Sequence, residues 1–176
     1  TDQENSQVNY TLDGRDNATT YADPRNLQTT YLRNGFGEVK RQSSPDSGNT
    51  DYVRDLRGLV TQKTDGRGIV SNMTYDNAGR VHTETNELGH TETYYYDEFN
   101  RLVEVEDRNG RIVQYEYDGR LLDKERWMDN GSPVRQINYD YRESPLAGTA
   151  GQINYVSDTG ADFGSPDDNV YYDYEY

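Results

Sequence analysis

Residues 75–81 read Tyr-Asp-Asn-Ala-Gly-Arg-Val, and residues 96–102, which begin 21 positions later, read Tyr-Asp-Glu-Phe-Asn-Arg-Leu. The same spacing relates tyrosines, aspartates, aliphatic residues and glycines along most of the chain. Self-similarity at a fixed period of roughly 20–50 residues is the signature of a repeat protein. We therefore interpret the chain as a tandem array.

The repeat is defined by columns of residues that we expect to have structural rather than chemical roles. The tyrosine, aspartate and aliphatic columns contain Tyr75, Asp76, Val81, Tyr94, Tyr96, Asp97, Leu102, Tyr115, Tyr117, Asp118, Tyr139 and Asp140. The turn glycines are Gly58, Gly68, Gly79, Gly89, Gly110 and Gly131.

Two kinds of turn are predicted to alternate. Asp-x-x-Gly and Asp-x-x-Asn segments, as at Asp76 to Gly79, are typical of a type I turn that ends in a positive-φ residue, which makes a three-residue hairpin loop. Asn109-Gly110 and Asn130-Gly131 are instead typical of two-residue type I′ loops. Turns every 10 or 11 residues leave strands of about six or seven residues and no room for helices.

The unequal loops also explain why the period is odd. Side chains alternate between the two faces of a strand, so an odd repeat returns each column to one face only if the pairing shifts by one residue per repeat. With one three-residue and one two-residue loop, we expect one face to carry Tyr75, Val81, Tyr96, Leu102 and Tyr117. The opposite face is expected to carry Tyr95, Val103, Val105, Gln114 and Glu116. The predicted fold is all-β, with antiparallel hairpin repeats in a curved single sheet.

The repeats are expected to occupy residues 1–141, most regularly 30–141. Residues 142–176 are interpreted as an irregular insertion followed by a degenerate final repeat. Within the insertion we expect a loop from Ser144 to Pro166, with an irregular hairpin near Asp158-Thr159-Gly160.

Composition excludes several classes of function. A net charge of −14 disfavours nucleic-acid partners. The chain has no cysteine and no apolar run of the roughly 20 residues that a membrane-spanning helix needs. Only 31% of residues are hydrophobic, and the 17 tyrosines suit sheet surfaces that contact water. The first residue is not methionine, so we expect a piece of a longer polypeptide.

No arrangement of residues predicts a catalytic site, a metal site or a cofactor. His82 and His90 are expected to form a solvated cross-strand pair. Glu104 and Glu116 could be taken for the two carboxylates of a glycosidase, but any acidic sheet offers such a pair. We therefore expect them to have a structural role. Asp158 with Asp162, and Asp167 with Asp168, lack the spacing of a calcium-binding EF-hand loop.

The segments 75–81, 96–102 and 117–121, each with Tyr-Asp at its start, closely resemble the YD repeats of the Rhs family. Residues 89–97 and 110–118 resemble the fuller pattern, which includes the preceding glycine and tyrosines. The resemblance implies a wall segment of a hollow, spiralling β-shell that encloses a toxin or effector polypeptide in secreted or cell-surface bacterial proteins. The partners that it implies are neighbouring repeats and the enclosed segment.

A different function is a carbohydrate-binding cell-surface module, because rows of tyrosine rings beside carboxylates suit sugar stacking. A hydrolase is a more distant alternative. The free edges of a sheet also predict self-association.

Overall fold

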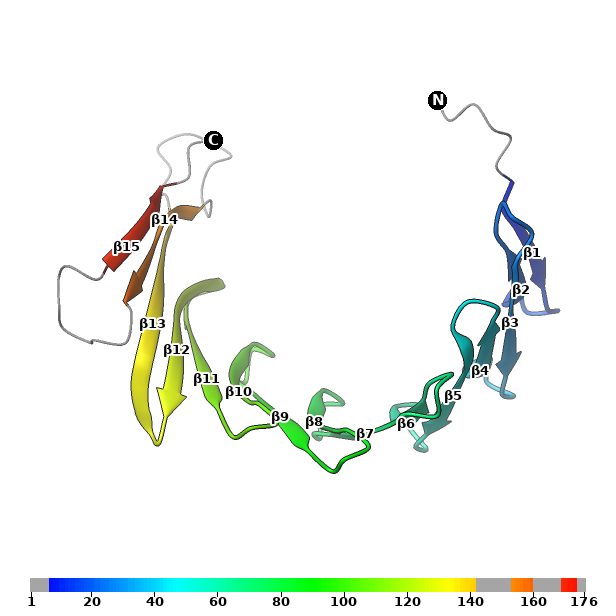
Figure 1. Ribbon diagram of the computed structural model, residues 1–176, viewed down its shortest axis with the longest axis horizontal. Coiled ribbons are helices and arrows are strands. Elements are labelled where there is room, and N and C mark those ends of the chain that lie inside the picture. The colour runs from blue at the N-terminus through cyan, green and yellow to red at the C-terminus, as the bar shows by residue number, and fades with distance from the viewer. Residues whose placement is uncertain (1–6, 142–152, 160–168, 174–176) are drawn as a thin grey trace. The chain divides into compact units, whose positions relative to one another are not determined.

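The computed structural model describes residues 7–141, 153–159 and 169–173. The chain divides into two compact units, residues 1–90 and residues 91–176. All regular elements in the described part are β-strands, and within each unit every strand pairs antiparallel with its neighbours in sequence (Figure 1). The predicted all-β, antiparallel hairpin architecture is confirmed.

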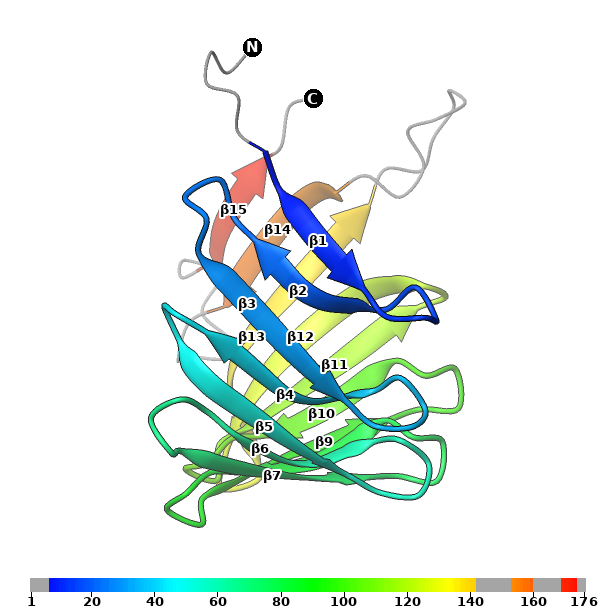
Figure 2. The ribbon, with the colours of Figure 1, turned by 90° about the vertical axis from the view of Figure 1, so that its right-hand side faces the viewer.

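The first unit contains eight strands in chain order. They are β1 (Asn9–Leu12), β2 (Ala18–Ala22), β3 (Gln28–Arg33), β4 (Val39–Ser44), β5 (Gly48–Arg54), β6 (Val60–Thr64), β7 (Val70–Tyr75) and β8 (Val81–Thr85). The second unit contains β9 (Thr91–Tyr96), β10 (Leu102–Glu106), β11 (Ile112–Asp118), β12 (Leu121–Asp129), β13 (Ser132–Tyr141), β14 (Ile153–Thr159) and β15 (Asn169–Asp173). Figure 2 shows the hairpin turns projecting at both ends of the strands.

Each unit is one layer thick. Among the described residues Ala22, 6% exposed, is the only buried hydrophobic residue, and no polar residue is buried. The hydrophobic core that a globular domain builds between layers is therefore missing from the described part. Cohesion has to come from the backbone ladder and from cross-strand side-chain pairs, which contribute about 0.2–1 kcal/mol each.

Most turns at both ends of the strands share one geometry. The first residue of the loop donates its N–H to the carbonyl of the fifth and accepts from the N–H of the fourth. The loops run from 13 to 17, 23 to 27, 34 to 38, 55 to 59, 65 to 69, 76 to 80, 86 to 90, 97 to 101 and 107 to 111. The fourth residue has positive φ, for example 83° at Gly79 and 65° at Asn100. Glycine, asparagine or aspartate occupies this position, because most other side chains clash in this conformation.

The prediction of a two-residue loop at Asn109-Gly110 is wrong. Asp107 N–H donates to the Arg111 carbonyl at 2.8 Å, and Gly110 N–H donates to the Asp107 carbonyl at 2.9 Å, so the loop contains three residues. Asp107 selects this geometry, because its carboxylate accepts the amide protons of Asn109 and Arg111. At Asn130-Gly131 the two-residue loop is present: Asp129 pairs with Ser132, and both loop residues have positive φ.

The loops at both ends of the central strands all contain three residues. The residue that makes the 21-residue repeat odd in length therefore comes from a β-bulge and not from a shorter loop. In β8, Val81 lies opposite Tyr75 and Thr83 lies opposite Thr74, so β8 contains one more residue, His82, than the matching step of β7. The same extra residue recurs at intervals of 21, at Thr19, Lys40, Thr61, His82 and Val103. A bulge of this kind inserts one residue and shifts the alternation of faces.

The bulges place the tyrosine columns on one face within each unit, which we call the tyrosine face. Tyr96 lies opposite Leu102, and Tyr94 lies opposite Val105, which in turn lies opposite Val113. Tyr115 and Tyr117 alternate with Val113 along β11 and share its face. The placement of Val105 on the opposite face was therefore wrong, because the bulge at Val103 reverses the alternation. The cross-strand register also places Tyr117 one residue beyond the position opposite Leu102.

The C-terminal part is more regular than predicted. Residues 153–159 form β14, which pairs with β13 and β15, instead of the loop expected from Ser144 to Pro166. The sequence Ile-Asn-Tyr-Val has the alternation and β-branched residues of a strand. Asp140 lies within β13, opposite Tyr155, and does not open a turn. The rest of the predicted insertion, 142–152 and 160–168, lies outside the described residues.

Deleting the bulge residue His82 should be far more damaging than deleting a complete repeat, residues 62–82. The single deletion reverses the alternation in β8 and removes several cross-strand pairs, so we expect a loss of roughly 1–5 kcal/mol of unfolding free energy. The repeat deletion joins Thr61 to Thr83 and keeps a bulge residue in place. Urea denaturation followed by circular dichroism measures both, and equal losses would contradict the role given to the bulge.

Candidate functional site

The first residue of each three-residue loop organises the turn through its side chain. Asp76 Oδ1 accepts the N–H groups of Ala78 and Arg80, both at 2.9 Å. Asn34 makes the same pair of bonds with its amide oxygen, at 3.0 Å to Phe36 and Glu38. The acceptor is thus required and the charge is not.

The charge nevertheless matters to the electrostatics of the turns. The pKa of Asp107 is lowered chiefly because the carboxylate accepts the backbone N–H groups of Arg111 and Asn109. The pKa of Asp76 is lowered by the bond from the Arg80 amide, despite some desolvation, and by the Arg80 guanidinium. Hydrogen bonds to the ionised form favour ionisation. We interpret these aspartates as structural anions.

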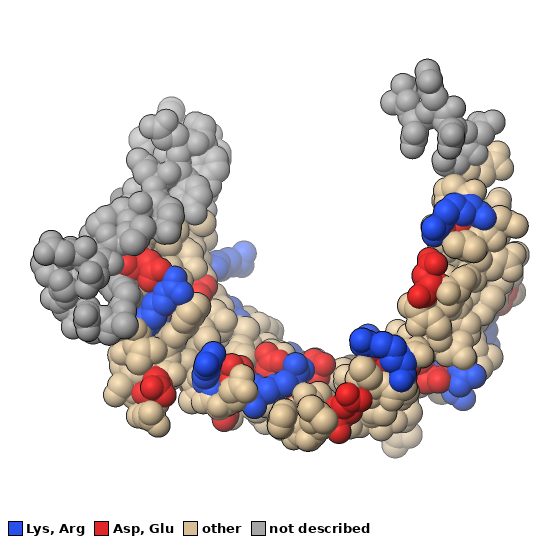
Figure 3. Space-filling view, in the orientation of Figure 1, with Lys and Arg blue, Asp and Glu red and all other residues tan. Residues whose placement is uncertain are grey.

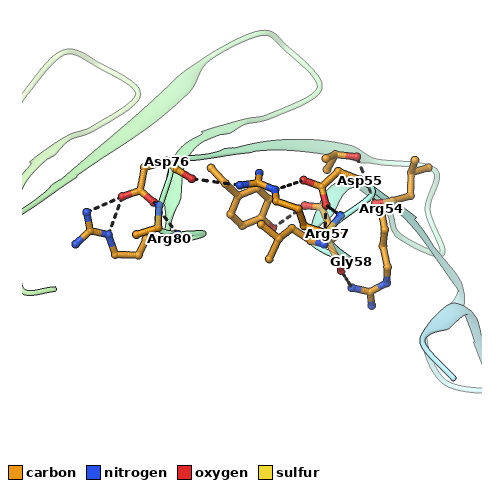
Figure 4. A network of polar contacts seen from close by, with 12 residues as sticks. Arg54, Asp55, Arg57, Gly58, Asp76 and Arg80 are labelled. Atoms are coloured by element: carbon orange, nitrogen blue, oxygen red, sulfur yellow. Dashed lines mark hydrogen bonds and ion pairs between the residues drawn. The ribbon is translucent and has the colours of Figure 1, made fainter. Parts of the chain in front are cut away.

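Arginines at the same turns form ion pairs and connect one turn to the next (Figure 4). Arg57 Nε lies 2.9 Å from Asp55, and Arg57 Nη1 donates to the carbonyl of Asp76 in the next turn at that edge, at 3.5 Å. Arg15 makes the equivalent bond to the Gly35 carbonyl at 2.6 Å. Exposed pairs of this kind each contribute little, about 0–1 kcal/mol. Their repetition along the edge is what links successive turns.

On the tyrosine face, two tyrosines of the column that precedes the aspartates each donate a hydrogen bond to a backbone carbonyl 15 residues earlier. Tyr75 Oη donates to the Val60 carbonyl at 2.7 Å, and Tyr117 Oη donates to the Leu102 carbonyl at 2.8 Å. Both acceptors lie immediately before a bulge residue, where the ladder is irregular. The tyrosine therefore satisfies a carbonyl at the point where the backbone ladder shifts register.

Two arginines occupy the same column in the first unit, a role that the sequence analysis missed. Arg33 Nε donates to the Ala18 carbonyl at 3.1 Å, and Arg54 Nη2 reaches the Val39 carbonyl at 3.5 Å. Each also donates to the carbonyl of the glycine in its own turn, at 2.8 Å. Arg54 Nε is buried without a hydrogen-bond partner among the described residues. Positions 33, 54, 75, 96 and 117 are spaced by 21, so the period itself was the available signal.

The opposite face, here called the polar face, carries hydrogen-bonded cross-strand pairs. Gln62 donates to Asn72 at 3.0 Å, and Gln114 donates to Glu104 at 2.9 Å. Glu116, the other member of the imagined glycosidase pair, instead forms an ion pair with Arg126. Both carboxylates are thus engaged by neighbouring strands.

The longer strands of the second unit carry two further clusters on the tyrosine face. The Arg135 guanidinium lies 4.3 Å from the centre of the Trp127 ring and pairs with Asp158, whose pKa it lowers. Tyr139 Oη donates to Glu125 at 2.8 Å. Burial raises the pKa of Tyr139, and the bond to Glu125 adds to this shift. These contacts hold β12, β13 and β14 together.

The remaining candidates from the sequence do not come together. His82 is the bulge residue of β8, whereas His90 closes the loop that begins at Asn86, so the two do not face each other as predicted. Asp118 ends β11 opposite Leu121, at a two-residue loop. The turn glycines all have positive φ: Gly58, Gly68, Gly79, Gly89, Gly110 and Gly131.

Within the described ranges, no group of three or more His, Asp or Glu side chains is placed to hold a metal ion. Asp162, Asp167 and Asp168 lie outside those ranges. One concave region lies beside neighbouring turns and is lined by Phe36 and Leu56, and another is lined by strand residues that include Val113 and Trp127. No helix long and apolar enough to cross a bilayer occurs in the described part.

The fold and its turns define a tandem β-hairpin repeat protein. Residues 75–112 and residues 96–123 match the RHS Repeat family. Residues 75–123 therefore contain repeats of the Rhs, or YD-repeat, type, as the resemblance of the Tyr-Asp segments implied. No curated protein matches the chain in sequence.

Solved structures share the fold. A TcdB2-TccC3-Cdc42 crystal structure matches 91% of this chain with a TM-score of 0.68 and 15% identity. A Tc holotoxin pore of Photorhabdus luminescens matches 94% with a TM-score of 0.68 and 11% identity. In each case the match spans 9% of the other chain. At this identity the likeness concerns the fold.

Replacing Tyr75 or Tyr117 with phenylalanine should destabilise the array by about 0.5–1.5 kcal/mol each, the usual net value of one hydrogen bond. The ring remains and only the bond to the carbonyl is lost. Tyr52→Phe is the matched control, because the Tyr52 hydroxyl makes no hydrogen bond to a described residue. Urea midpoints of the three variants give the comparison, and an equal change in the control would contradict the proposed role of the hydroxyls.

Asp76→Asn should reduce the acid sensitivity of the fold. The folded-state pKa of Asp76 lies below the ordinary value of 3.8, so its stabilisation is present above that pH and is lost as pH falls through the folded pKa. We expect the wild type to be more stable than the variant at neutral pH, with the difference shrinking as pH falls below 3.8 and vanishing once Asp76 is protonated in the folded state.

The reverse change, Asn86→Asp, is the matched control and should add acid sensitivity at an equivalent turn. Urea midpoints measured across the acid range test both changes. Parallel pH profiles for the wild type and Asp76→Asn would show that the carboxylate charge is unimportant.

Proposed function

We propose that this chain is a wall segment of an Rhs-type shell that encloses a toxin or effector polypeptide in a secreted or cell-surface bacterial protein. The observation that carries the proposal is the single-layer architecture, in which Ala22 is the only buried hydrophobic residue of the described part. A sheet without a core of its own separates two spaces. It needs no reactive group to do so.

The lateral bonding supports this role. Within each unit every strand is paired with its sequence neighbours, and arginine side chains connect successive turns along an edge. Figure 3 shows positive and negative side chains interspersed over the visible face rather than gathered in one patch. Such a surface suits containment better than attraction of one charged substrate.

The same contacts argue against the sugar-binding alternative. Sugar recognition on the tyrosine face would use exposed rings and free hydroxyls, but the hydroxyls of Tyr75 and Tyr117 donate to the sheet's own carbonyls. Tyr139 is likewise engaged by Glu125. Titration calorimetry with oligosaccharides should therefore give no saturable heat, and saturable binding would favour the alternative.

Limited proteolysis of the longer polypeptide that carries this array tests containment. The enclosed segment should resist protease in the wild type and become cleavable when the wall is opened by Ser71→Pro. Proline removes a backbone donor from β7, a strand with partners on both sides.

Leu56→Pro is the control, because proline is favoured at the second position of this turn and Pro24 already occupies it in the loop from 23 to 27. The control should keep the segment protected. Rapid cleavage in the wild type, or continued protection in Ser71→Pro, would overturn the proposed role of this wall.

A further inference from the structure

Two tyrosine rings meet in the first hairpin. Tyr10 in β1 lies directly opposite Tyr21 in β2, with ring centroids 5.3 Å apart and an angle of 52° between the planes. This separation lies within the usual contact range of aromatic pairs, about 4.5–7 Å. Tyr10 is 61% exposed, so the pair lies at the surface and is accessible from solvent.

We propose that Tyr10 and Tyr21 form an oxidative cross-linking site that yields dityrosine. The oxidant is hydrogen peroxide acting through a haem peroxidase. Each phenol loses one electron and one proton, and the two radicals join through a carbon–carbon bond between ring positions next to the hydroxyls. The ring protons then shift to restore both phenols. The two electrons and two protons reduce one peroxide molecule to two water molecules.

The position of this pair differs from that of the tyrosines in the central repeats. The Tyr75 and Tyr117 hydroxyls donate to backbone carbonyls, and both side chains are part-buried. In contrast, every residue of β1 is exposed, and within the described part β1 is paired with β2 alone. A covalent bond between Tyr10 and Tyr21 would tie the exposed first strand to the second across the loop from 13 to 17.

The cross-link has a thermodynamic consequence that can be measured at individual amides. A link that closes a loop of about 12 residues should lower the opening equilibrium of the hairpin by about a hundredfold, on the chain-entropy estimate for cross-links. Hydrogen exchange of the β1 amides should slow accordingly, whereas amides of β7 should be unaffected. This effect is independent of the proposed wall function.

The test treats this chain with hydrogen peroxide and a haem peroxidase and then digests it with trypsin. Cleavage after Arg15 and Arg25 separates the two tyrosines, so the expected product is peptide 1–15 joined to peptide 16–25 with the loss of two hydrogen atoms. Tyr10→Phe and Tyr21→Phe should each abolish it. Tyr52→Phe is the control and should leave the yield unchanged.

A mixture of isotopically heavy and light protein distinguishes a bond within one molecule from a bond between molecules. The proposal requires only heavy–heavy and light–light products. Absence of the joined peptides, mixed-isotope products, or an equal loss in Tyr52→Phe would overturn it. Unchanged hydrogen exchange in β1 after cross-linking would overturn the proposed tie between the two strands.

Discussion

The alternation of side chains between two faces is the constraint on which the whole array depends. A repeat of 21 residues would send its tyrosines to alternate faces unless each repeat contained one extra residue in one of its strands. The bulge supplies that residue, at Thr61 and again at His82. The hydroxyl of Tyr75 then bonds the Val60 carbonyl beside the bulge, so the aromatic column and the backbone irregularity stabilise each other.

The turns add a second, more local level of organisation. One oxygen of an aspartate or asparagine closes most three-residue loops, and in the loop that begins at Asp55 an arginine, Arg57, pairs with the carboxylate and reaches the next turn. Asn34 and Asn86 show that the acceptor alone can close the loop. An acidic chain can therefore crowd many carboxylates along its edges, because most of them are held by amides and guanidinium groups.

Much of the fold could be predicted from the sequence, because the period and the turn residues are local signals. The pairs Tyr75 with Val81 and Tyr96 with Leu102 were correct. The bulge was not predictable in the same way, since the residues at its column, among them Lys40, His82 and Val103, share no chemistry. Missing it led to the wrong loop at Asn109-Gly110 and the wrong face for Val105. Arg33 and Arg54 were missed because they replace tyrosine with a different donor.

Within each unit, the described strands that are distant in sequence do not contact one another, and this has a consequence for how the polypeptide acquires its structure. Within each unit a strand bonds only to the strands directly before and after it, so the formation of each hairpin closes only a short loop. Structure can grow in one direction, one hairpin at a time, while the chain emerges from the ribosome. The completed hairpin then serves as the template for the next strand.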